Sequence, residues 1–230
     1  MDIRTASRVA GAVSLIVGPL ALAIPIAITD DDAPIAAQLH DYANHPALAT
    51  LSNIVLLPAI LILPAVIYAA RLARRGAPGL AFVGGGLAAL GWIAGFMSIG
   101  AVQIALYQGS TLADQAGAAT LIDKMNGDPT YGTLVGVFVL GHVIGMIVLG
   151  VGLWRSRAVA PWVAALFIAY PVGHLVGHAI NPVIDAISSV ILLVSAVAVA
   201  AKILRTPNEQ WDLPSGKGVT VAEPVAGVAA

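Results

Sequence analysis

Long runs of apolar residues alternate with short polar stretches along the chain. Six of these runs are long enough to cross a bilayer as a helix, which takes about 20 residues. They cover residues 9–28, 47–70, 80–107, 132–154, 161–180 and 183–204. Glycine and proline recur inside the runs, as in helices surrounded by lipid, and the prolines predict bends. Segments that alternate in the manner of β-barrel strands are missing. The pattern predicts an all-α fold, a polytopic transmembrane helix bundle with six spans.

The composition excludes several classes of protein. Hydrophobic residues make up 59% of the 230 residues and charged residues only 10%, with a mean hydropathy of +0.91. A soluble domain of this length could not bury so much apolar surface. The net charge of -1 offers no basic footprint for nucleic acid. The lack of cysteine excludes disulfides and thiolate metal sites.

Lysine and arginine are distributed unevenly over the loops. Ten of the eleven cations lie at the two ends of the chain or in the loops after the second and fourth spans. Only Lys124 lies in one of the remaining loops, which belong to the opposite side of the membrane. Because cationic loops stay in the cytoplasm, we expect both termini to be cytoplasmic, in a multi-pass protein of the plasma membrane. Trp154 and Trp162 bracket one of the inner loops, where interfacial indoles belong. The ten inner cations are Arg4, Arg8, Arg71, Arg74, Arg75, Arg155, Arg157, Lys202, Arg205 and Lys217.

The two ends of the chain need separate interpretation. Arg4 and Arg8 precede the first apolar run as in a signal peptide, but the length of the run favours a retained span. Residues 206–230 contain proline, glycine and scattered charge, so we expect a flexible cytoplasmic tail after a single membrane domain of residues 1–205.

The outer loops are long enough to form short helices. One is expected within residues 33–45. Another is expected after Thr111, with Thr111 and Asp114 as a capping box and Asn126-Gly127 as its stop. Leu121, Ile122 and Met125 would share one face of this helix.

Polar side chains inside the hydrocarbon are costly, so each one is a candidate for function. The candidate polar residues all lie in the outer half or the middle of their spans. Polar residues with only a packing role would have no reason to prefer one leaflet. The candidates are Asn53, Gln103, His142, His174, His178 and Asp185.

The histidines have spacings that suit metal or cofactor chemistry. His174 and His178 are four residues apart, so they share a helix face and could hold one metal ion together with His142. His142 and His174 lie at similar depth on successive spans, so they could also bind a haem iron from both sides. Asp185 could join them around Zn²⁺, Fe²⁺ or Cu²⁺. Each of these two histidines follows one glycine of a pair spaced by four. Such pairs let helices pack closely, and they could also leave room for a macrocycle.

Three functions are compatible with these residues, beside a plain packing role. The first is a binding or redox protein, with His142 and His174 as cofactor ligands and His178 as a further metal ligand. The second is a membrane-embedded enzyme that acts on a lipid or isoprenoid, with Asp185 or His178 as acid or base. The third is a small transporter or assembly partner. Asn53 and Gln103 would line the cavity in each case. Expected partners are membrane lipid and a hydrophobic small molecule, with no nucleic acid.

One stretch resembles a known group of proteins. Gly152-Leu-Trp-Arg-Ser-Arg-Ala-Val-Ala-Pro-Trp162 is similar to the inner loop of uncharacterised bacterial multi-span proteins of unknown function. The resemblance covers about a tenth of the chain. It implies a six-helix bacterial inner-membrane protein and carries no activity with it.

Overall fold

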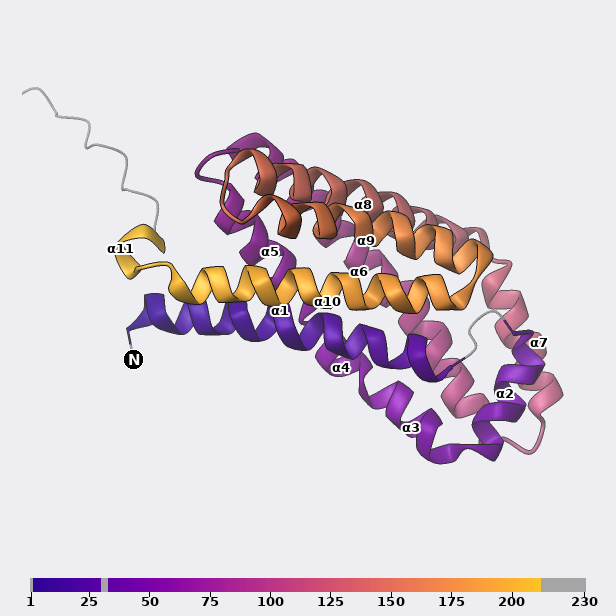
Figure 1. Ribbon diagram of the computed structural model, residues 1–230. Coiled ribbons are helices and arrows are strands. Elements are labelled where there is room, and N and C mark those ends of the chain that lie inside the picture. The colour runs from indigo at the N-terminus through magenta and orange to yellow at the C-terminus, as the bar shows by residue number, and fades with distance from the viewer. Residues whose placement is uncertain (1, 30–32, 212–230) are drawn as a thin grey trace, which may run out of the picture.

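The computed structural model describes residues 2–29 and 33–211, and within these ranges all regular structure is helical (Figure 1). This confirms the predicted all-α class. The helices are α1 (Ile3–Ile28), α2 (Ile35–Asn44), α3 (Pro46–Ile54), α4 (Leu56–Ala59), α5 (Ile62–Ala73), α6 (Pro78–Gly109), α7 (Gln115–Asn126), α8 (Pro129–Arg155), α9 (Pro161–Ile180), α10 (Pro182–Arg205) and α11 (Asn208–Trp211).

Six helical segments of the described ranges are long and apolar enough to cross a membrane. Their bounds are Ile3–Ile28, Pro46–Ala73, Pro78–Gly109, Pro129–Arg155, Pro161–Ile180 and Val183–Arg205. Each contains one predicted span. The segment Pro161–Ile180 coincides with its predicted span, and the other five extend past theirs at one or both ends. Large apolar side chains such as Phe82 and Leu140 are 82% and 63% exposed, as lipid-facing residues should be. The chain is an integral, multi-pass membrane protein in contact with lipid.

The second span is broken into three helices, α3, α4 and α5. Pro58 and Pro64 have no N–H with which to reach the carbonyl four residues earlier, so the ladder is interrupted before each of them. Between the helices the backbone makes tighter bonds over three residues, such as Leu61 N to Pro58 O at 3.1 Å. The prolines inside α1 and α9 leave those helices continuous. The predicted bending is thus most evident in the second span.

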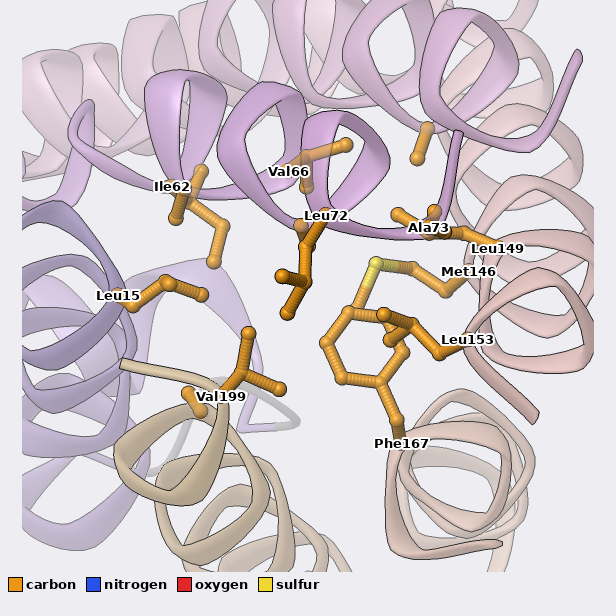
Figure 2. Packing of buried hydrophobic residues seen from close by; sticks show 14 of the residues in the cluster. Leu15, Ile62, Val66, Leu72, Ala73, Met146, Leu149, Leu153, Phe167 and Val199 are labelled. Atoms are coloured by element: carbon orange, nitrogen blue, oxygen red, sulfur yellow. The ribbon is translucent and has the colours of Figure 1, made fainter. Parts of the chain in front are cut away.

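Helices α6 and α8 pack closely against each other. A Cβ at Gly91 would collide with the backbone of His142, and one at Gly145 would collide with Ala88. Small residues therefore let the two antiparallel helices approach backbone to backbone. Together with α1, α5, α9 and α10 they form the apolar core, in which Met146, Leu149 and Phe167 are at most 2% exposed (Figure 2).

Both described ends of the chain lie at one end of the bundle, which we call the basic end because its loops carry the predicted inner cations (Figure 1). Arg8 donates to the carbonyl of Leu204, and Asn208 donates to Asp2 at 2.9 Å. Trp211 is buried, and the guanidinium of Arg71 lies 4.6 Å from the centre of its ring. The beginning of the predicted flexible tail therefore packs on the bundle. Residues 212–230 of that prediction lie outside the described residues.

The opposite end, which we call the distal end, is covered by α2 and α7 (Figure 1). Both short helices were expected, but the start of α7 differs. Asp114 is itself the N-cap and accepts from Gly117 N at 2.8 Å, so the capping box beginning at Thr111 is wrong. The helix ends at Asn126 as predicted. Ile122 is buried, but Leu121 is 61% exposed, so these two residues do not share the packed face.

Asp128 caps the distal start of α8. Its carboxylate accepts from the backbone N–H of Thr130 at 2.7 Å and of Tyr131 at 3.4 Å. These hydrogen bonds favour the charged form, so the pKa of Asp128 lies below its ordinary value. The cap sets where α8 begins and thereby the depth of the residues that follow.

Candidate functional site

The candidate site lies where the hairpin of α9 and α10 meets α8, in the distal half of the bundle. Asn181 alone connects α9 to α10, and its side chain caps α10 by accepting from Val183 N at 2.8 Å. A Cβ at Gly177 would collide with the backbone of Asp185. This close approach places the first turn of α10 directly beside the last turns of α9.

His174 and Asp185 are joined across this contact. His174 donates its Nδ1–H to Oδ1 of Asp185, and the two side chains are 21% and 9% exposed. Asp185 also stands in the first turn of α10, where the helix dipole favours a negative charge. The carboxylate therefore has two sources of stabilisation within the membrane, the helix start and the imidazole.

His142 approaches the same pair from α8. It is 1% exposed, and its ring centre lies 5.6 Å from that of His174, nearly edge to face. Phe138 stacks on it at 4.7 Å, and Trp92 lies 5.2 Å away. The backbone carbonyl of Phe138, one helical turn earlier, is directed at the imidazole of His142. Nevertheless, neither ring nitrogen makes a hydrogen bond of ordinary geometry with a described residue.

Tyr170 completes the cluster, and sequence reasoning missed it. Its ring is buried and stacks on His174 at 5.7 Å, and it lies 6.1 Å from His142. Tyr170 precedes His174 by four residues, so the two share one face of α9. The same spacing that drew attention to His178 could have identified it.

His178 extends the cluster toward the distal surface. Its ring centre lies 6.5 Å from that of His174, and the residue is exposed. The three imidazoles of His178, His174 and His142 thus form a row from the exposed end of α9 to the buried centre of α8.

Asn53 and Gln103 are not part of this cluster. Gln103 donates to the hydroxyl of Tyr42 at 2.8 Å, beside the contact between α2 and α6 at the distal end. Asn53 is half-buried on α3, and no described residue bonds its buried Oδ1. The two amides share the depth of the histidines, but no hydrogen bond or ring contact in the described ranges connects them to the cluster.

The cluster does not fit the metal and haem hypotheses. No three histidine, aspartate or glutamate side chains of the described residues are grouped closely enough to hold a metal ion. A haem would have to lie between His142 and His174, but these rings are in edge contact and aromatic rings surround His142. The glycines beside the histidines contact neighbouring helices and leave no space for a macrocycle.

Comparisons with protein-family models, curated proteins and solved structures give no match. The function must therefore be argued from the chemistry of the cluster itself.

Proposed function

We propose that this membrane protein binds and passes protons at the site formed by His142, His174 and Asp185. The observation that carries the proposal is the hydrogen bond between His174 and Asp185 inside the apolar bundle. A carboxylate that accepts the Nδ1–H of a histidine fixes its tautomer, orients the ring and stabilises its protonated form. The other ring nitrogen, Nε2, is then the atom that takes up and releases the proton.

The burial of the three side chains supports this role. Ionisable groups at membrane depth are costly, and proton relays are a common reason for their presence. His142 carries unsatisfied nitrogens at 1% exposure, although buried polar groups normally have partners. Exposed His178 supplies an entry for protons from the distal surface, and His174 lies between it and His142.

The packing around His142 bears on the hypotheses of an enzyme and of a transporter. Aromatic rings occupy its surroundings, which suits the transfer of a proton better than the binding of a bulky substrate at that ring. We therefore favour a small transporter that couples to protons over an enzyme acting on a lipid or isoprenoid. Such an enzyme would use Asp185 or His178 as acid or base on a substrate entering from the distal leaflet.

Infrared difference spectroscopy tests the proton site. Wild-type protein in lipid nanodiscs should show a carboxyl band that changes with pH and is missing from Asp185→Asn. His174→Gln should shift that band, because it removes the partner of the carboxylate. The matched control is Asp41→Asn, which removes the carboxylate of the exposed His45–Asp41 pair and should leave the band in place. Identical difference spectra for wild type and Asp185→Asn would contradict the proposal.

Metal and haem analysis of the same purified sample separates this proposal from the ligand hypotheses. The proposal expects neither in fixed proportion to the protein. A metal or haem present at one per chain, and lost from both His142→Ala and His174→Ala but retained by His40→Ala, would replace the proton site with a metal or cofactor site.

The cation asymmetry supports cytoplasmic termini and a plasma membrane location for this protein. The basic end would face the cytoplasm, and the histidine row would open to the outside. Reporter fusions after Arg75 and Arg157 should then give a cytoplasmic signal, and a fusion after Asp123 an external one. The reverse pattern would invert the direction from which protons enter.

A further inference from the structure

A groove runs along the lipid-facing side of the hairpin formed by α9 and α10. It has a volume of about 580 Å³, within the range of about 300–1,000 Å³ that small-molecule sites occupy. Its walls are almost entirely apolar, with Ala165 and Ala169 on α9 and Ile187 and Ile191 on α10. The hydroxyl of Ser188 in the wall donates to the carbonyl of Ile184 in its own helix, so its hydrogen is already bonded. The lining therefore suits a hydrocarbon chain.

The groove points toward the basic end. Figure 1 shows α9 and α10 separating from their connection toward that end. Gly173 and Ser188 are close enough for a Cβ on the glycine to collide with the hydroxyl, so the helices are in contact in the distal part of the groove. Trp154, at the last turn of α8, forms its opposite limit. A chain lying in the groove would have its head beside Trp154, at the depth of the membrane interface.

Exposed cations lie toward the basic end on both α8 and α10 or just beyond them. Arg155 and Arg157 follow Trp154 directly and are exposed. On α10, exposed Lys202 lies eleven residues beyond Ile191, about three helical turns, so it continues the face that lines the groove. Long cationic side chains of this kind reach the phosphate level at the edge of a membrane.

We propose that the groove binds an anionic phospholipid from the leaflet at the basic end. One acyl chain lies between α9 and α10, and the phosphate interacts with Arg155, Arg157 and Lys202. The site is separate from the histidine cluster and does not depend on the proton-binding role.

Native mass spectrometry of the purified protein tests this site, with phosphatidylglycerol and phosphatidylcholine as the two probes. Wild type should retain phosphatidylglycerol more strongly, by about fivefold for each cation that contacts the phosphate. Changing Arg155, Arg157 and Lys202 together to Gln should abolish the preference. The control is Arg4→Gln with Arg75→Gln, two exposed cations outside the groove, which should preserve it.

Filling the groove provides an independent variant. Ala169→Phe should lower retention of both lipids at least tenfold, whereas Ala101→Phe on the exposed side of α6 should not. Because Ala169 is exposed, the new side chain does not enter the core, and Ala165→Leu gives a smaller version of the same test. Equal retention of the two lipids by wild type, or unchanged retention in both groove variants, would overturn the proposal.

Discussion

Replacing Gly91 with leucine should separate α6 from α8 and strongly destabilise the bundle. A Cβ at this position collides with the backbone of His142, which cannot rotate away as a side chain could. Overpacking typically costs about 1–3 kcal/mol, and the loss here should reach about 3 kcal/mol because the opposing atoms belong to the backbone. We expect the thermal transition of the detergent-solubilised variant to fall sharply, and the surroundings of His142 to change with it.

Gly86→Leu is the matched control on the same helix. Gly86 is exposed, and apart from its own helix turn nothing lies within 4 Å of where its Cβ would be. Its replacement should change the free energy of unfolding by no more than about 0.5 kcal/mol. Equal losses for the two leucine variants would show that helix propensity or lipid contact, and not the α6–α8 approach, sets the effect at Gly91.

Removing either partner of the His174–Asp185 pair should have the second large effect. His174→Ala or Asp185→Ala leaves a polar group buried without its partner, which costs about 3–5 kcal/mol. The double variant should lose much less stability than the sum of the two single losses, because neither buried polar group is left without its partner. Unfolding of all four proteins in a denaturing detergent measures the coupling energy.

The chain contains its own control for this cycle. His45 and Asp41 form a second histidine–aspartate pair at 2.9 Å, but their side chains are 57% and 55% exposed. Screening by water and the loss of side-chain entropy reduce the net stabilisation from such pairs to about 0–1 kcal/mol. If the two cycles give the same coupling energy, burial contributes nothing to the His174–Asp185 pair, and its interpretation as a membrane-embedded acid–base site is wrong.

The sequence predicted the spans well for a physical reason. A helix surrounded by lipid must be apolar over the full membrane thickness, so each span is marked by its own residues. The contacts at the basic end could not be predicted in this way. Trp211 lies in a polar stretch that resembles a mobile tail, and it is held on the bundle by ring contacts with Tyr68 and Arg71 and by a hydrogen bond from its indole N–H to Ser7.

The candidate site was predictable in part. Counting residues along a span gives depth, and depth alone grouped His142, His174 and Asp185. It also grouped Gln103 with them, although that side chain bonds Tyr42 on another side of the bundle. Depth says nothing of rotation about the helix axis, which is set by contacts such as that of Gly91 with the backbone of His142. Those contacts depend on residues distant in the sequence.

The central claim is that protons reach His174 from His178 and that the hydrogen bond to Asp185 orients the imidazole of His174 to accept them. Nitrogen-15 NMR of histidine-labelled protein in nanodiscs tests it most directly. As the pH of the sample is raised stepwise from acid to alkaline, the resonances of His174 and His178 should change together. Asp185→Asn should alter the response of His174 and leave that of His45 intact. A His174 ring whose protonation never changes over this range, in wild type and in Asp185→Asn alike, would contradict the claim.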